Sequence, residues 1–498
     1  SYIHLKTKLD DAVISAAKSG KDIVLTGNPG DGKTHIIRVL KEQLERLATP
    51  VIIELDASTL SNEEIYSRWA PAKDRHTPFV IAINAAVLFS VYKSYPDFRP
   101  IKEAYFQMTN AVVFHDEDAN TDSVIVFDLS KRDALSSEIL KQAVIKMTDD
   151  CHYLECKNCP LFNSCVVHKN RKLLNNELFQ KRLSLIFQRV SLKGYHATLR
   201  EIQSFIAYLI FGNRSCKQLN QTAGNSEYDI VSLIYSGTGK LFEAINAALD
   251  PVNISHPIWD ERILLNNIPS ESWAEDYDVP AEAIAFDNEK LFNLKKRQFF
   301  FFNRYGNELL YILDDDTTRF QKFLTQENGK IIKELIFKLN SFFGTANGST
   351  TKLQIWSGHR YNNEPRKVLI STGTIKRSEF SVGRPVLLQS MQSGIEMTSN
   401  YIRLEKKESP NIFLKIDFEM YLLLNEAEHG VPVLFMESDL VKKVWRFVEQ
   451  LQSYKDIEDA DSVEIGLMDV QNKKTILVDI DREDNKYSSI DSERIREV

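Results

Sequence analysis

The chain has 498 residues, of which 43% are hydrophobic and 26% are charged, and its formal net charge is −7. These values exclude a disordered chain, which has fewer apolar residues and a larger net charge. The longest apolar run, residues 79–92, is too short and too polar to span a bilayer. The first 21 residues are amphipathic and charged, so we expect no signal peptide and a cytosolic protein of two to four domains.

The first 130 residues alternate apolar runs with helix-forming segments. Strands are expected at 23–25, 51–56, 78–84 and 124–129, with helices over 4–18, from about 33 to 47, and after 61. Strands and helices that alternate at this spacing predict a parallel sheet with crossover helices. A further apolar run, 111–115, lies too close to the last strand for a crossover and predicts one arm of a β-hairpin.

A glycine-rich loop follows the first expected strand and precedes a helix. Its residues match the pattern G-x-x-x-x-G-K-[ST] in full: Gly27, Asn28, Pro29, Gly30, Asp31, Gly32, Lys33 and Thr34. Glycines let backbone N–H groups converge on phosphate oxygens, and the helix N-terminus faces the anion. In such loops the lysine bridges the β- and γ-phosphates and the hydroxyl holds Mg²⁺. The loop therefore predicts an ATP and Mg²⁺ site. We expect His35, which follows Thr34, to contact the nucleotide together with the loop.

An acid that ends a neighbouring apolar strand is expected to organise Mg²⁺ and its waters. Asp128, at the end of 124–127, is our first choice, and Asp56, at the end of 51–55, is the second. The pair Asp116 and Glu117 comes third, because a hairpin spacing does not suit parallel strands. A solvated strand-end carboxylate is the alternative at each position.

Two further polar residues are candidates for contact with the γ-phosphate. Asn84 ends the strand 78–84, where an amide suits a sensor of the γ-phosphate or of the attacking water, and a turn residue is the alternative. Arg200 lies in the first turn of a helix expected to continue to Phe211. A cation there is unfavourable without a partner, so we expect Arg200 at the γ-phosphate or in a surface salt bridge.

Residues from about 131 to 249 have a helical pattern that a group of cysteines interrupts. Four of the five cysteines lie within fifteen residues: Cys151, Cys156, Cys159 and Cys165. Four thiolates suit Zn²⁺ or an iron–sulfur cluster, and the spacing leaves both open. Four unpaired thiols are the alternative, and Cys216 is expected in the core.

The segment from Lys295 to Tyr305 contains both cations and aromatic residues, including four consecutive phenylalanines. We expect a buried helix there rather than a nucleic-acid surface, because continuous Phe runs are normally buried. Lys169 to Lys172 is either a phosphate contact or a solvated loop. Residues 451–498 carry 13 acidic and 7 basic side chains, a net −6, so most of the excess charge lies in this tail.

The expected fold is α/β with four parts. They are a P-loop NTPase core with a parallel sheet at 1–140, a helical lid with the cysteines at 141–250, a linker and helical region at 251–345, and a mixed α/β domain with the acidic tail at 346–498. The last part takes strands over 353–418, a helix over 438–454 and a strand over 475–480.

The motifs together resemble the F component of bacterial phosphorothioation-dependent DNA restriction systems, the DptF (DndF) family, over most of the chain. The residues that carry the resemblance are Gly27–Thr34, Glu54–Ser58, Pro78–Asn84, Val126–Arg132, the cysteines and Thr198–Glu201. The resemblance implies an AAA+/STAND-type ATPase in the bacterial cytosol. It implies two further subunits as partners in restricting DNA that lacks backbone sulfur, with DNA contacted through the complex and no membrane partner.

Three functions therefore remain open for the chain: an ATP-hydrolysing subunit, a nucleotide-binding scaffold without turnover, and a non-enzymatic DNA-binding subunit. A homo-oligomer is also left open. In the first function we expect Lys33, Asn84, Asp128 and Arg200 to be catalytic, with Thr34 and Asp56 as contacts of the metal ion.

Overall fold

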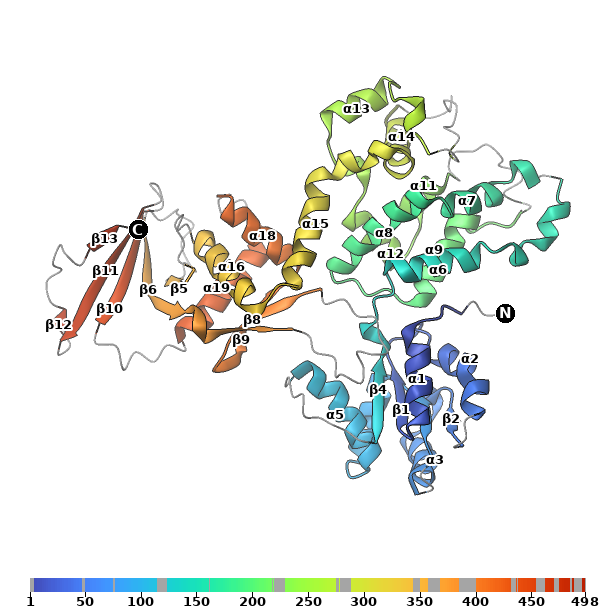
Figure 1. Ribbon diagram of the computed structural model, residues 1–498, viewed down its shortest axis with the longest axis horizontal. Helices are drawn as coiled ribbons and strands as arrows, with labels where there is room; N and C mark the ends of the chain where they lie inside the picture. Colours follow the sequence, from blue (N-terminus) through green and yellow to red (C-terminus); the bar gives the residue numbers. More distant parts are fainter. Residues whose placement is uncertain are drawn as a thin grey trace. The chain divides into compact units, whose positions relative to one another are not determined.

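The computed structural model describes residues 4–46, 50–74, 77–113, 123–160, 162–216, 218, 229–274, 277, 288–343, 350–356, 368–384, 400–430, 436, 438–453, 462–469, 474–483, 486–487 and 495–497. The chain divides into two compact units, the first running to Asp314 and the second beginning at Asp315 (Figure 1). This division falls inside the region 251–345, and the finer division into four parts stays a prediction.

A parallel sheet forms the first part of the first unit. Its four strands are β1 (Asp22–Thr26), β2 (Ile52–Glu54), β3 (Phe79–Ala82) and β4 (Val124–Asp128), in the order β2-β3-β1-β4. Because the strands are parallel, their carboxyl ends lie at one edge of the sheet, where open α/β sheets bind ligands. The parallel sheet and its α/β class agree with the sequence analysis.

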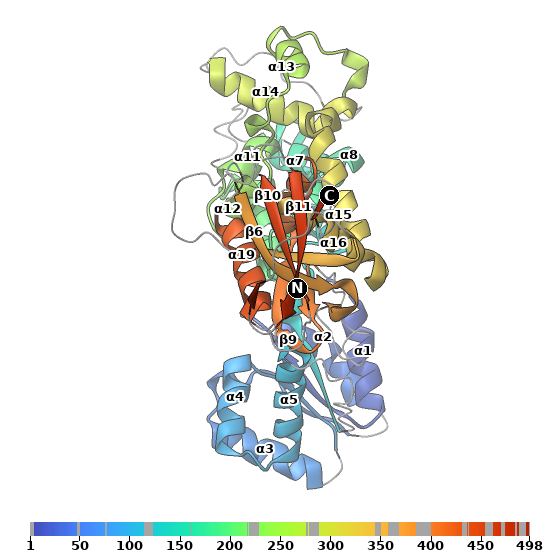
Figure 2. The same ribbon diagram turned by 90° about the vertical axis from the view of Figure 1, so that its left-hand side faces the viewer.

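Helices cover both faces of this sheet (Figure 2). On one face, α1 (Lys8–Lys18) and α2 (Lys33–Glu45) pack against Ile23 and Leu25. On the other, α3 (Asn62–Asp74), α4 (Ala85–Ser94) and α5 (Arg99–Val113) pack against Val24. Successive side chains of a strand point to opposite faces, so β1 is apolar at adjacent positions because both faces are covered.

Helix α5 corrects one expectation. Residues 111–113 form its last turn, whereas the sequence analysis assigned them to a β-hairpin. Short apolar runs do not distinguish a strand from a buried helix segment, and here the run continues a helix that begins at Arg99. Asp116 and Glu117 lie outside the described residues.

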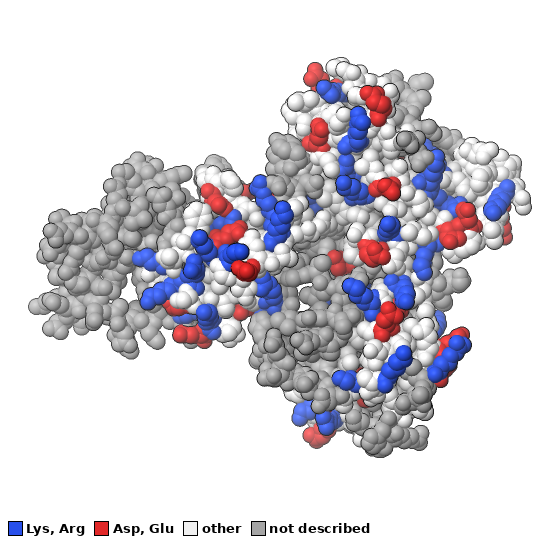
Figure 3. Space-filling view, viewed as in Figure 1, with Lys and Arg blue, Asp and Glu red and all other residues white. Residues whose placement is uncertain are grey.

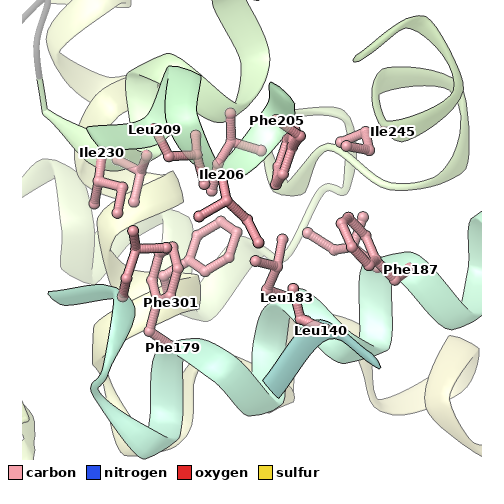
Figure 4. Packing of buried hydrophobic residues seen from close by; sticks show 14 of the residues in the cluster. Leu140, Phe179, Leu183, Phe187, Phe205, Ile206, Leu209, Ile230, Ile245 and Phe301 are labelled. Carbon is pink, nitrogen blue, oxygen red and sulfur yellow. The ribbon is translucent and has the colours of Figure 1, made fainter. Parts of the chain in front are cut away.

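A bundle of helices follows β4 in the first unit, as the helical pattern predicts. Its members are α6 (Ser137–Met147), α7 (Val166–Leu174), α8 (Glu177–Leu192), α9 (Leu199–Phe211), α11 (Ile230–Ser236), α12 (Lys240–Ala248), α13 (Pro257–Leu264) and α14 (Asn288–Phe302). Figure 4 shows Leu183 of α8, Ile206 of α9 and Phe301 of α14 meeting in its core. Phe299 to Phe302 have no exposed surface, which confirms the expected buried helix.

The second unit is mixed α/β. Its elements are most of α15 (Tyr311–Leu324), α16 (Asn328–Phe342), β5 (Lys352–Trp356), β6 (Val368–Lys376), β7 (Phe380–Gly383), β8 (Ile402–Lys406), β9 (Ser409–Ile416), α18 (Phe418–Glu428), α19 (Ser438–Ser453), β10 (Ser462–Asp469), β11 (Lys474–Glu483), β12 (Lys486–Tyr487) and β13 (Ile495–Glu497). One sheet has the order β12-β11-β10-β6-β5, with β13 beside β11, and a second has the order β7-β8-β9. In the described part of the chain, no helix combines the length and apolarity that a bilayer crossing needs.

Truncation of the helical core tests this packing. We expect Ile206→Ala to lower the free energy of unfolding by about 2–5 kcal/mol, because Ile206 is fully buried between helices and the change leaves a cavity. Ile258→Ala is the matched control on a residue that is 63% exposed, and it should change stability by less than about 0.5 kcal/mol. Urea unfolding followed by circular dichroism measures both, and equal losses in the two variants would contradict the packing.

Candidate functional site

The loop between β1 and α2 has an unusual backbone. Gly27, Gly30 and Gly32 have φ angles of +139°, +100° and +94°, a region that residues with a Cβ rarely adopt. A Cβ at Gly30 would also lie 3.2 Å from the Thr198 hydroxyl oxygen and 3.4 Å from the Arg200 Cβ. Glycine is therefore required at Gly30 both by the loop conformation and by the close approach of α9.

Lys33 begins α2, and its side chain folds back on the loop. Its ammonium donates hydrogen bonds to the carbonyl oxygens of Gly27, at 2.8 Å, and Asn28, at 3.0 Å. Burial lowers the pKa of the Lys33 ammonium, and the carboxylates of Asp31, Asp56 and Asp128 oppose that shift. The lysine is thus held at the loop by neutral acceptors, which an anionic ligand would outcompete.

Asp31 is a buried carboxylate within the loop itself. One carboxylate oxygen accepts a hydrogen bond from the Asn28 amide at 2.6 Å, and the other lies 3.3 Å from Nε2 of His196. The guanidinium of Arg132 donates to the Asp31 carbonyl oxygen at 2.6 Å. Arg132, which follows β4, and His196, which precedes α9, therefore hold the loop through contacts with Asp31.

The ends of β2 and β3 meet through a serine. The Asp56 carboxylate accepts a hydrogen bond from the Ser58 amide at 2.9 Å, and Asn84 donates from Nδ2 to the Ser58 hydroxyl at 3.2 Å. The hydrogen bonds from Ser58 lower the pKa of Asp56, burial opposes them, and the Lys33 charge lowers it further. Asp56 is therefore held as a carboxylate facing the loop lysine.

These residues line one pocket of about 460 Å³, a size within the usual range for small-molecule sites. The loop side contributes Pro29, Gly30, Gly32, Lys33, Thr34 and His35. The segments that follow the strands, helix α9 and the N-terminal segment contribute Asp56, Ser58, Asn84, Arg132, Leu199, Arg200, Gln203, His4 and Leu5, with Ile36 and Arg38 of α2.

The two leading acid candidates are placed differently. Asp56 lines the pocket, whereas Asp128 is not among its lining residues. The Asp128 carboxylate accepts hydrogen bonds from the amide of Ser130, at 3.1 Å, and from its hydroxyl, at 2.6 Å, with the Lys131 ammonium 3.7 Å away. Asp128 caps the turn after β4 as Asp56 caps the turn after β2, so the pocket lining alone favours our second choice over our first.

Arg200 reaches the pocket because the start of α9 is anchored on the loop. The Arg200 amide donates to the Gly30 carbonyl at 3.3 Å, and Thr198 and Glu201 form a capping box. Asn84 and Arg200, both expected near the γ-phosphate, thus line the same pocket as Thr34.

Sequence reasoning assigned no role to two residues that the pocket contains. Arg132 is 3% exposed and contacts the loop, and its position shortly after a strand-end acid was the available signal. His4 lies with Nδ1 3.2 Å from Nε2 of His35 and Nε2 3.0 Å from the Asp10 carboxylate. The sequence around His4 gives no sign that it lines a pocket, because its partners, Asp10 of α1 and His35 of α2, come from two different helices.

The cysteines lie in the helical part of the first unit, and none of them lines the pocket. Cys151 is exposed, and Cys156, Cys159 and Cys165 are half-buried. Cys216, expected in the core, is exposed, and it lies four residues beyond Gly212, the C-cap of α9. Among the described residues, no three His, Cys, Asp or Glu side chains are already arranged to hold a metal ion. Metal binding by the cysteines stays a prediction.

Comparison with family models, with curated proteins and with solved structures finds no match to this chain. The functional conclusion therefore depends on the geometry of the pocket and on the sequence motifs that form it.

The capping box at the start of α9 gives a pH prediction for this helix. Burial raises the pKa of Glu201, but hydrogen bonds from the Thr198 amide, the Tyr195 hydroxyl and the Thr198 hydroxyl outweigh it and leave the pKa below its usual 4.5. A lowered carboxylate pKa stabilises the fold above pH 4.5, and this stability is lost as pH falls through the folded-state pKa.

We therefore expect the melting temperature of the wild type to fall more steeply below about pH 4.5 than that of Glu201→Gln. Thermal unfolding followed by circular dichroism from pH 3 to pH 7 measures the difference, and parallel curves for the two proteins would refute it.

Proposed function

We propose that this chain is an ATP-binding P-loop ATPase that acts as a subunit of a DNA restriction complex in the bacterial cytosol. The observation that carries the proposal is a pocket that five residues of the loop 27–34 line together with Asp56, Asn84 and Arg200. A phosphate-binding loop with a strand-end acid, an amide and an arginine is the residue set that phosphoryl transfer uses.

The groups in the pocket suit a magnesium-bound triphosphate. Four cationic residues line it, Lys33, Arg38, Arg132 and Arg200, and the amides at the start of α2 add the positive end of a helix dipole. The Thr34 hydroxyl and the Asp56 carboxylate are oxygen ligands of the kind that Mg²⁺ prefers. Bound Mg²⁺ neutralises charge on the phosphates, and the chain's own residues bind and orient them.

Hydrolysis needs a group that orients water at the γ-phosphate, and Asn84 is our candidate. Its amide is held by Ser58 at the end of β3, within the same pocket. We assign Asp56 rather than Asp128 to the metal, because Asp56 lines the pocket and Asp128 does not.

A nucleotide-binding scaffold is the second candidate, and one observation favours it. Among the described residues that line the pocket, Asp56 is the only carboxylate, so no second acid is present there as a general base. In this case ATP would order an interaction surface for partner subunits without being hydrolysed.

The restriction role rests on the resemblance to the DptF family, with the other subunits as partners. Figure 3 shows acidic and basic side chains interspersed on the described surface of this face, without a continuous basic stripe. The buried Phe299–Phe302 run also provides no stacking surface for bases. We therefore propose that DNA is contacted through the complex rather than by this chain alone.

Substitutions in the pocket test the ATPase proposal. We expect Lys33→Ala to weaken Mg-ATP binding at least about 10-fold, because a charge-assisted hydrogen bond contributes about 1.5–3 kcal/mol. Asp56→Asn should lower turnover about 100-fold, because a metal ion supplies several kcal/mol of transition-state stabilisation, whereas Asp128→Asn should stay near the wild type.

Nucleotide binding by calorimetry and phosphate release, each with and without DNA, separate the candidates. Equal turnover in the wild type and in Lys33→Ala would end the enzyme proposal. Tight binding without phosphate release would favour the scaffold, and loss of turnover in Asp128→Asn alone would reverse the assignment of the acid.

Direct DNA binding by the isolated chain is the third function, and salt dependence tests it. We expect no more than weak binding in a mobility-shift assay, and any binding that persists should weaken steeply as salt rises from 50 to 200 mM. Sequence-independent binding with nanomolar affinity at 200 mM salt would contradict our proposal.

A further inference from the structure

Helix α13 exposes an apolar face at the outer margin of the helical part, as Figure 1 and Figure 2 both show. Ile258, Leu264 and Leu265 are 63%, 66% and 68% exposed, the highest values among the large apolar side chains of the described residues. Apolar side chains that are exposed singly need no explanation, whereas a group of them in one place marks an interaction surface. These three lie within two turns of one helix and therefore form such a group.

The opposite face of α13 is fixed in the bundle. Trp259 and Ile263 are buried in its core. The Trp259 indole N–H donates to the Glu308 carboxylate at 2.8 Å, and the Asp260 carboxylate lies 2.6 Å from the Lys296 ammonium. Because these contacts hold one face of the helix inward, the apolar side chains of the other face stay outside.

The backbone after α13 also keeps the two leucines exposed. Asn266 has a φ angle of +53°, and the Asn267 amide donates to the Arg262 carbonyl at 2.8 Å. A left-handed residue followed by this hydrogen bond is a common helix ending. Leu264 and Leu265 directly precede this ending, so their backbone is fixed as well.

One acid and one base lie at the centre of the exposed face. Glu261 and Arg262 are exposed and lie midway between Ile258 and Leu265. The Leu265 amide donates to the Glu261 carbonyl at 2.9 Å, so Leu265 continues the helical turn. Residues three, four and seven positions after Ile258 share its side of a helix. The Arg262 guanidinium lies 5.0 Å from the centre of the Trp259 ring, which orients the cation.

This order of side chains is complementary to itself. If two copies of α13 pack antiparallel about a two-fold axis between residues 261 and 262, Ile258 of one copy faces Leu265 of the other. The same axis sets Glu261 of each copy opposite Arg262 of the other. A parallel pair would instead bring the two Glu261 carboxylates together, which is unfavourable. Charge complementarity therefore favours a second copy of this chain, packed antiparallel.

We propose that two copies of this chain associate through antiparallel contact of their α13 helices. The contact is weak, because one helix of 8 residues covers less area than the roughly 800 Å² per partner of a stable complex. We expect a dissociation constant of about 10–100 μM. No residue of α13 lines the nucleotide pocket, so the proposal does not depend on ATP binding.

Sedimentation equilibrium of the full-length protein, from about 1 to 200 μM and without nucleotide, tests the association. We expect a reversible equilibrium between monomer and dimer. Leu265→Glu should weaken it at least about 10-fold, because it places a charge in the apolar contact. Leu154→Glu is the matched control on another exposed leucine, 59% exposed, and should leave it unchanged. A monomer at every concentration, or equal effects of the two substitutions, would overturn the proposal in favour of a different partner for this face.

Exchange of the two charges tests the antiparallel arrangement. Glu261→Arg and Arg262→Glu should each weaken self-association about 10-fold, because like charges then face each other. A mixture of these two variants should form a mixed dimer, and the double variant E261R/R262E should associate like the wild type. Circular dichroism checks that every variant is folded. Association that tolerates both single changes, or that neither the mixture nor the double variant restores, would overturn the antiparallel contact.

Discussion

The first unit depends on the close approach of helix α9 to the loop at Gly30. The Arg200 amide donates to the Gly30 carbonyl, and the absence of a Cβ at Gly30 leaves room for Thr198. Asp31 is held in addition by His196 and Arg132. Because residues on both sides fix the loop, the helical part determines the shape of the pocket as much as the sheet does.

Charge is balanced inside this pocket rather than at its surface. Lys33 is nearly buried and bonds to neutral carbonyl oxygens, while Asp31 is a carboxylate enclosed by the loop that should receive an anion. Asp31 is tolerable there because its oxygens accept an amide hydrogen bond and face an imidazole. If a nucleotide binds, its phosphate oxygens would replace the Gly27 and Asn28 carbonyl oxygens as hydrogen-bond acceptors of Lys33, and Asp31 would stay in place.

Helix α9 contacts both the glycine-rich loop and the segment that carries the cysteines. Its middle, including Ile206, is fixed in the bundle core, its first turn contacts the loop, and its last turn packs against the cysteine-bearing segment.

The sequence alone determined features that depend on neighbouring residues. The loop 27–34, the four strands of the parallel sheet and the burial of Phe299–Phe302 all follow from local spacing and apolar runs. The same local reasoning misassigned residues 111–113, because a short apolar run fits a strand and a helix end equally well.

Only the tertiary structure placed one of the two leading acids, Asp56, among the residues that line the pocket. It also packed the turns that carry the cysteines against the last turn of α9, through the Tyr153–Phe211 contact. These choices depend on packing between distant segments, which is set by burial over the whole unit and leaves no periodic signal in the sequence.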